Sequence, residues 1–230
     1  MKITYNTFSE KGPRSENQDH IRTMTDAENG RYSFVLCDGM GGHAMGGTAA
    51  KIVAASICRD IMRKRDVDER NIRFMISRAA WTLDTMSDVY GGIQMGTTMV
   101  MAHIDGNQLT VAHCGDSRCY VYGCEGKAKY VTTDHNAGNC IGAPLARGFF
   151  TGHPDMATPD VFTSKVEPGD RVFLCSDGLW SSIRPDILRD RMLDDKDPEE
   201  IMDTYKLAGG HGSGWWCRES DLWRQSISTG

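Results

Sequence analysis

Aspartates at the ends of apolar, strand-like runs constrain the fold of this chain more than any other feature. They lie in four short motifs: RSENQD at 14–19, CDGMGGH at 37–43, GDSR at 115–118 and SDGLW at 176–180. Carboxylates that border buried strands far apart in sequence predict that those strand ends converge. Mg²⁺ and Mn²⁺ need such a set of oxygen ligands. Arginine beside a cation site indicates an oxyanion substrate, and phosphate is the first candidate.

The composition is that of a globular protein. The chain has 230 residues, of which 40% are hydrophobic and 25% are charged, enough for one large domain with a buried core. A net charge of −5 without a basic block disfavours nucleic acid as a partner. No apolar run has the length of a membrane span, and the N-terminus lacks the apolar stretch of a signal peptide. We therefore expect neither membrane insertion nor secretion.

The cysteines indicate a reducing compartment. There are eight of them, with no CxxC pair and no common zinc spacing. Several lie inside strand-like or helix-like runs, where a free thiol behaves as a small buried apolar group. We expect free thiols in the cytoplasm rather than a disulfide framework or a zinc site.

The order of predicted elements favours an α+β fold with layered packing. Strand-like runs at 2–8 and 31–38 precede two helical periods at 48–65 and 69–90. A hairpin is predicted over 97–114 with its turn at Asp105–Gly106, and strands follow at 119–123 and 128–133. A second hairpin is predicted from VFTSKV and RVFLCSD around Pro168–Asp170, after a long irregular loop at 136–160. Short helices are predicted at 185–192 and 198–208, and from Gly209 the pattern fails.

Single motifs have ordinary explanations. Each Asp-Gly pair, at Asp38 and at Asp177, would alone favour a turn. Two such pairs, each ending a buried strand, favour a shared metal role, with one carboxylate bridging two ions roughly 3.5–4 Å apart. Asp19 alone is compatible with a helix cap, and Arg14 with a solvated side chain. No histidine is assigned a metal role, although His43 lies in the glycine loop.

The GDSR and TTDHN motifs have mainly structural interpretations. We expect Arg118 to hold the hairpin rather than contact substrate. The pair Asp134–His135 is expected to fix a loop rather than transfer a proton.

Together, the four motifs in this order, with MGTTMV at 95–100 and TTDHN at 132–136, resemble the metal-dependent protein phosphatases, the type 2C serine/threonine family. DGMGG at 38–42 is typical of the bacterial branch. The resemblance spans about residues 2–208. It implies a four-layer α-β-β-α sandwich with two central antiparallel sheets, as a single domain over 1–230 that is atypical from about 209. It also implies two Mg²⁺ or Mn²⁺ ions in a cleft at one end of the sheets.

The resemblance also implies roles for individual residues. Asp38 would bridge both ions, the Gly39 carbonyl would be a further ligand, and Asp177 would bind the first ion. Asp19 would act through bound water, and Asp116 would help hold a third, weaker ion. Catalysis would then depend on Arg14, Asp19 and Asp38, with Arg14 holding the substrate phosphate while a metal-bridging hydroxide attacks phosphorus in line.

Three departures from the family pattern bear on activity. Gln18 replaces a common glutamate, and Met40 replaces a histidine proposed as general acid in the animal branch. The third is the most consequential: the terminal Asp-Asn pair that completes the first metal site is missing. Asp221 lies at a suitable distance after Asp177, but Leu222 follows it. The flap between His135 and Val161 is also short.

The sequence thus predicts a cytoplasmic, monomeric, bacterial-type protein serine/threonine phosphatase. Its expected partners are phosphorylated proteins and a cognate kinase. One alternative is an inactive or weak phosphatase-like domain that binds phosphoproteins or a regulator. Two others are a phosphatase for one dedicated regulator in a sigma-factor pathway and a hydrolase of small phosphate esters.

Overall fold

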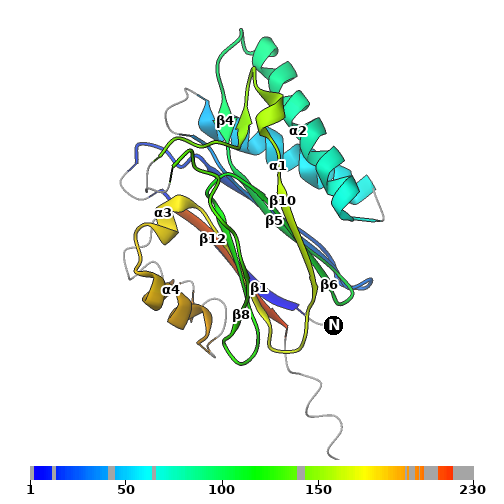
Figure 1. The fold of residues 1–230 in the computed structure, drawn as a ribbon, viewed down its shortest axis with the longest axis vertical. Helices are drawn as coiled ribbons and strands as arrows, with labels where there is room; N and C mark the ends of the chain where they lie inside the picture. Colours follow the sequence, from blue (N-terminus) through cyan, green and yellow to red (C-terminus); the bar gives the residue numbers. More distant parts are fainter. Residues whose placement is uncertain are drawn as a thin grey trace, which may run out of the picture.

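Two five-stranded antiparallel sheets form the centre of the molecule (Figure 1). A computed structural model describes residues 3–11, 14–40, 45–63, 66–138, 143–194, 196, 200–201, 203–204 and, as backbone, 212–219. One sheet has the order β1-β12-β11-β7-β8, and the other has the order β10-β6-β5-β3-β2. Their strands are β1 Ile3–Glu10, β2 Asp19–Asp26, β3 Arg31–Asp38, β5 Met99–Asp105, β6 Gln108–Cys114, β7 Arg118–Tyr122, β8 Ala128–Val131, β10 Asp160–Lys165, β11 Arg171–Cys175 and β12 Gly212–Glu219.

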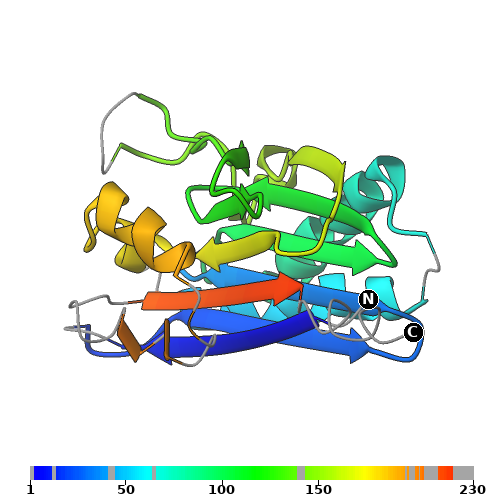
Figure 2. The same cartoon turned by 90° about the horizontal axis from the view of Figure 1, so that it is seen from below.

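Helices cover the outer face of each sheet (Figures 1 and 2). The long helices α1 and α2 pack on the sheet that contains β3, whereas α3 and α4 pack on the sheet that contains β11. The described helices are α1 Gly46–Arg63, α2 Glu69–Val89, α3 Asp177–Trp180, α4 Pro185–Met192 and the 3₁₀ turn η1 Pro154–Met156; a small third sheet pairs β4 Gly96–Thr97 with β9 Phe149–Phe150.

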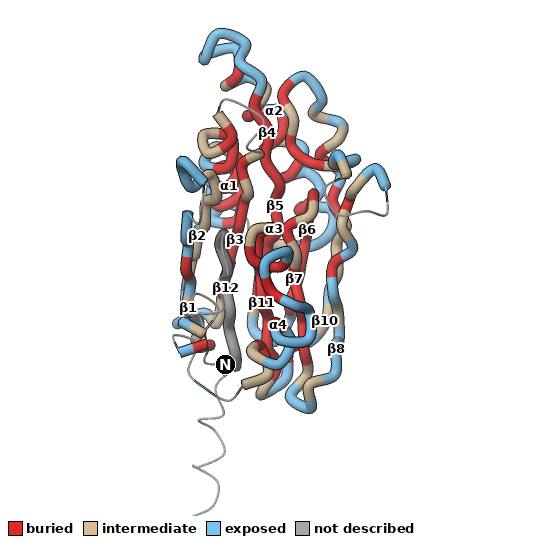
Figure 3. Tube along the Cα trace, turned by 90° about the vertical axis from the view of Figure 1, so that its left-hand side faces the viewer, coloured by how far each residue is buried: buried red, intermediate tan, exposed pale blue. Residues whose placement is uncertain are grey.

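Three buried clusters separate the four layers. Along β3, Phe34 and Leu36 point between the sheets, where they meet residues of β7 and β11. Val35 and Cys37 point the other way, into the cluster with α1 and α2. Because successive side chains of a strand face opposite sides, a strand buried on both faces reads as a continuous apolar run. Figure 3 shows this burial along β3, β5, β6, β7 and β11. The predicted sandwich is confirmed.

Most predicted elements are confirmed within two residues at each end. The helices at 48–65 and 69–90 are α1 and α2, and the hairpin over 97–114 is β5 and β6. Its turn uses Gly106 at φ +60°, a conformation that favours glycine. The irregular segment 136–160 also contains β9 and η1. The helix predicted at 198–208 falls largely outside the described residues.

Two sequence-based expectations about strands are wrong. The runs on either side of Pro168–Asp170 do not form a hairpin, because β10 pairs with β6 and β11 pairs with β7 and β12. The turn instead carries the chain from one sheet to the other. The segment after Gly209, where no strand was expected, contains β12, which lies between β1 and β11 in the sheet. Backbone pairing on both edges, rather than alternation in sequence, defines this strand.

Candidate metal-binding active site

Asp19 and Asp38 lie directly opposite each other at one edge of a sheet. Asp19 begins β2, Asp38 ends β3, and the antiparallel register pairs the two residues. Side chains of directly paired residues project from the same face, with Cβ atoms roughly 5 Å apart. The Ser176 hydroxyl, which precedes α3 on the other sheet, donates to Asp19 Oδ2 at 2.9 Å. The two sheets therefore meet at this pair of carboxylates.

Asp177 brings a third carboxyl group to the same point. It is the first residue of α3, two residues after the end of β11. Burial raises the pKa of Asp38 well above its usual range, and the charges of Asp19 and Asp177, with hydrogen bonds to both groups, raise it further. Like charges held together in this way destabilise the ionised form until a cation neutralises them. Three of the predicted metal ligands are thus neighbours.

Asp116 adjoins this group from the turn between β6 and β7. Burial, followed by the charges of Asp177 and Asp134, raises the pKa of Asp116 to about 6. The Trp180 indole donates to the Asp116 carbonyl at 2.9 Å, so α3 and the GDSR turn support each other. Gly115 has φ +122°, and a Cβ there would lie 2.7 Å from Thr98 Cβ, so both backbone conformation and packing require glycine.

Two threonines of the MGTTMV motif fix the backbone of Asp38. The Asp38 N–H donates to Thr98 Oγ1 at 3.1 Å, and its carbonyl accepts from the Thr98 N–H at 2.9 Å and from Thr97 Oγ1 at 2.8 Å. Thr98 Oγ1 also lies 2.7 Å from Ser117 Oγ, which connects Asp38 to the GDSR turn. The Asp38 carboxylate thus projects from a backbone held at both its amide and its carbonyl.

Gly39 is buried where the glycine loop leaves β3. A Cβ at this position would lie 2.3 Å from the carbonyl group of Gly46 and 2.8 Å from the Gln18 oxygen. Its N–H donates to the Gln18 carbonyl at 3.2 Å. Any side chain would displace the start of α1, so packing requires glycine at this position.

Arg118 and Asp134 have the structural role expected from sequence. The guanidinium group makes two hydrogen bonds of 2.8 Å to the carboxylate and lies 3.5 Å from the centre of the Trp180 ring. This bidentate pair joins the start of β7 to the TTDHN segment. Arg118 therefore has a structural role and stabilises the contact between these elements.

The remaining predicted residues are not brought to the cluster by any described contact. Arg14 is exposed in the segment between β1 and β2, five residues before Asp19. Asp221 and His43 lie outside the described residues. Sequence reasoning gave no individual role to Thr98, Ser117, Ser176 or Trp180. All four nevertheless stood in motifs that were singled out: Thr98 in MGTTMV, Ser117 in GDSR, and Ser176 and Trp180 in SDGLW.

A second cluster contains His113, His135 and Asp160, whose candidate ligand atoms lie within 4.8 Å of one another. Its hydrogen bonds do not favour a metal. The Gly115 N–H donates to His135 Nδ1, so the neutral ring carries its proton on Nε2, the atom that faces Asp160. Arg147 also lies at this point, 2.8 Å from Asp160 Oδ1.

The four-aspartate cluster, in contrast, suits hard divalent cations. We define it as Asp19, Asp38, Asp116 and Asp177. It offers carboxylate oxygens and no thiolate or imidazole among the described residues, a donor set that selects Mg²⁺ or Mn²⁺ over softer metals. The pKa values of Asp38 and Asp116 are raised first by burial and then by neighbouring carboxylates, whose charge a bound cation would neutralise.

Comparisons with known proteins identify the family of this chain. A family profile described as protein phosphatase 2C matches residues 12–205. The putative protein phosphatase 2C-type of Streptococcus pyogenes serotype M6 is 29% identical over 91% of this chain and 93% of that protein. The protein phosphatase PhpP of Streptococcus pneumoniae serotype 2 is 29% identical over 79% of this chain and 80% of that protein.

A solved structure has the same fold. The catalytic domain of the serine/threonine protein phosphatase PstP, in complex with two manganese ions, superposes with a TM-score of 0.76. The superposition covers 94% of this chain and 96% of that domain, and the two sequences are 22% identical.

Proposed function

This chain belongs to the protein phosphatase 2C family and is a metal-dependent protein serine/threonine phosphatase, and we propose that its reaction takes place at the four-aspartate cluster. The observation that carries the assignment is the Asp19–Asp38 pair at one sheet edge, joined by Asp177 from the other sheet. Mg²⁺ or Mn²⁺ is the cofactor, and two bound ions would activate water and neutralise phosphate charge.

We propose a separate role for each residue of the cluster, according to its position. Asp38 interacts with both Asp19 and Asp177 and would hold both ions, with the Gly39 carbonyl as a further ligand. Asp177 would hold one ion, and Asp19, fixed by Ser176, would orient water bound to the ions. Asp116 would hold a further, weaker ion on the side of the GDSR turn.

Arg14 is the proposed phosphate-binding residue. It is exposed and can reach a ligand in solvent without losing a partner that the structure describes. Its guanidinium group can bind two phosphate oxygens at once. Asp221 is proposed as a replacement for the terminal ligand of the family, because it follows Asp177 at a suitable distance.

The substrates are phosphorylated proteins, and we infer that a kinase of the same cell supplies them. We further infer a single-domain, monomeric enzyme of the cytoplasm that acts neither on nucleic acid nor at a membrane. Six described cysteines are free thiols, five of them buried, which supports a reducing compartment. No described helix has the length and apolar character needed to cross a bilayer.

Replacing Asp38 with alanine tests the site. We expect Mn²⁺ binding by calorimetry to be lost and hydrolysis of a phosphothreonine peptide to fall by at least about a thousandfold. Asp88→Ala, on the exposed face of α2, is the matched control and should behave as wild type. Wild-type Mn²⁺ affinity in Asp38→Ala would remove the assignment. A wild-type chain with no turnover in Mn²⁺ would instead favour the phosphoprotein-binding alternative.

A further inference from the structure

A hydrogen-bonded chain leads from the surface to the GDSR turn. Asp160 Oδ2 lies 3.0 Å from His135 Nε2, and His135 Nδ1 lies 3.2 Å from the amide nitrogen of Gly115. Gly115 directly precedes Asp116. The His135 backbone N–H also donates to the Gly115 carbonyl at 3.0 Å. One residue therefore holds both the amide and the carbonyl of the glycine before a proposed metal ligand.

The contacts with Gly115 and Asp160 fit one tautomer of His135. Arg147 Nη1 lies 3.3 Å from Nε2 and in this tautomer hydrogen-bonds to Asp160 rather than to the ring. The Gly115 N–H is a donor, so Nδ1 must present its lone pair. The proton of the neutral ring is then on Nε2, where the Asp160 carboxylate accepts it. An Nδ1 proton would point at another N–H and break the contact with Gly115. Asp160 thus selects the tautomer that the turn requires.

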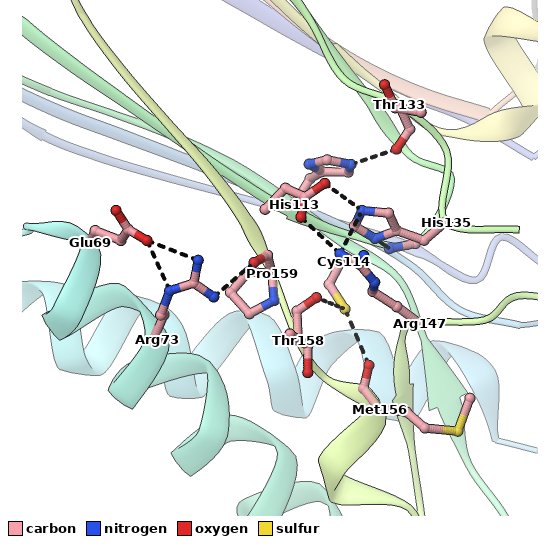
Figure 4. A network of polar contacts seen from close by, with 12 residues as sticks. Glu69, Arg73, His113, Cys114, Thr133, His135, Arg147, Met156, Thr158 and Pro159 are labelled. Carbon is pink, nitrogen blue, oxygen red and sulfur yellow. Dashed lines mark hydrogen bonds and ion pairs between the residues drawn. The ribbon is translucent and has the colours of Figure 1, made fainter.

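The ring and the carboxylate are themselves fixed. His135 is 7% exposed and stacks on His113, with ring centres 4.3 Å apart. Arg147 donates to Asp160 Oδ1 at 2.8 Å, and Arg73 of α2 donates to the neighbouring Pro159 carbonyl at 3.1 Å. Figure 4 shows His113 and Arg147 beside His135, and Arg73 reaching Pro159 from α2.

We propose that Asp160 and His135 act as a relay that positions Gly115 and thereby aims the Asp116 carboxylate at the metal site. His135 and Asp160 are positioning residues that contact neither the ions nor the substrate. The proposal rests on the proposed function, because it assigns Asp116 to that site. It also gives the TTDHN motif a second task beside the Arg118–Asp134 pair.

Two variants of His135 separate the relay from simple packing. The amide oxygen of His135→Asn takes roughly the place of Nδ1 and can still accept from Gly115. His135→Gln reaches Asp160 instead and leaves the Gly115 N–H without its acceptor. Calorimetric titration with Mn²⁺ alone should show the weakest site weakened about tenfold in His135→Gln, the loss of about one neutral hydrogen bond. His135→Asn should remain within about twofold of wild type.

The variant Asp160→Asn tests the tautomer of His135 in the metal-free protein. Nitrogen NMR of the metal-free protein should show the Nε2-protonated ring in wild type and a shift toward Nδ1 protonation in the variant. Mn²⁺ binding at the weakest site should weaken by about the same tenfold. Asp160 lines a pocket of about 500 Å³ with Arg147 and Asp155. Asp155→Asn, exposed on the same wall, is the matched control and should change neither measurement.

Each outcome decides the proposal. An Nδ1-protonated ring in wild type would overturn it, as would equal Mn²⁺ affinities in His135→Gln and His135→Asn. Circular dichroism of each variant identifies a general loss of fold. A wild-type protein with the expected tautomer but without phosphatase turnover would contradict the proposed function and leave the relay intact.

Discussion

Asp38 and Arg14 illustrate two kinds of functional residue. The backbone of Asp38 is bonded by Thr97 and Thr98 at its carbonyl and by Thr98 at its amide, and Gly39 admits no side chain beside it. Such support keeps a ligand in position before an ion arrives, which preserves binding energy that ordering would otherwise cost. Arg14 is exposed, and its predicted partner is the substrate itself.

Arg14→Ala should therefore affect substrate binding and leave the metal site unchanged. A charge-assisted contact contributes about 1.5–3 kcal/mol, so the KM for a phosphothreonine peptide should rise roughly tenfold to hundredfold. Mn²⁺ affinity should remain that of wild type. Steady-state kinetics with varied peptide, beside calorimetry, measure the two effects. Arg70→Ala, on the exposed face of α2, is the control, and an unchanged KM in Arg14→Ala would make Arg14 a surface residue.

At the scale of elements, a row of polar side chains crosses the otherwise apolar helix-facing side of β3, β5 and β6. Ser33, His103 and Thr110 occupy paired positions on these strands, and all three are buried. Ser33 Oγ lies 2.7 Å from His103 Nδ1, while His103 Nε2 has no hydrogen-bond partner. A charged ring here would be poorly solvated.

This row predicts a loss of stability in acid. Burial lowers the pKa of His103 to about 4; Asp105 partly opposes the shift, and Arg31 adds to it. Above about pH 6.5 the ring is neutral in both the folded and the unfolded chain, so it does not change the free energy of unfolding with pH. As the pH falls from 6.5 to 4, the His103 ring becomes protonated in the unfolded chain but stays neutral in the folded chain. The free energy of unfolding should therefore fall by up to about 3 kcal/mol.

Urea denaturation at several pH values measures this loss. His103→Asn keeps an acceptor near Ser33 but does not titrate, so its unfolding free energy should depend less on pH over the same interval. The exposed His153→Asn should keep the wild-type dependence. Equal slopes in wild type and His103→Asn would contradict the assignment.

Elements with strong periodicity were predictable, and elements defined by distant partners were not. The helical spacing of Val53, Ile57 and Ile61 places α1 correctly, because one face of the helix packs on a sheet. The connection at Pro168–Asp170 has ordinary turn chemistry, yet it changes sheets, because β11 finds its partners in β7 and β12. Local sequence cannot encode that choice.

The same distinction applies to the four-aspartate cluster. Strand-end aspartates were recognisable in sequence, and the β2–β3 register brings Asp19 and Asp38 together. The supporting contacts of Thr98, Ser117 and Ser176 cross between segments about 20 to 160 residues apart, so their roles depend on the completed fold. Serine and threonine occur in many structural contexts. Their role at this site therefore cannot be inferred from the sequence and follows only from the contacts made in the folded chain.

At the scale of the whole molecule, β12 connects β1 to the rest of its sheet. It pairs along its full length with β1 and along five residues with β11, and Figure 2 shows it between the first strand and the sheet centre. Without β12, the strand at the N-terminal end of the fold loses its only neighbour among the strands described, and β11 has an open edge. Unpaired backbone groups at such an edge are costly and promote association.

Two shortened chains separate the contribution of β12 to folding from the metal role proposed for Asp221. A chain that ends at His211, directly before β12, should fail to fold cooperatively, because the sheet loses an interior strand, and it should unfold without a sharp transition on heating. A chain that ends at Glu219 keeps β12 and should fold. If Asp221 is a ligand, that chain should bind Mn²⁺ more weakly, and wild-type affinity would exclude Asp221 from the site. Cooperative melting of the shorter chain would contradict the pairing of β12 with β1 and β11.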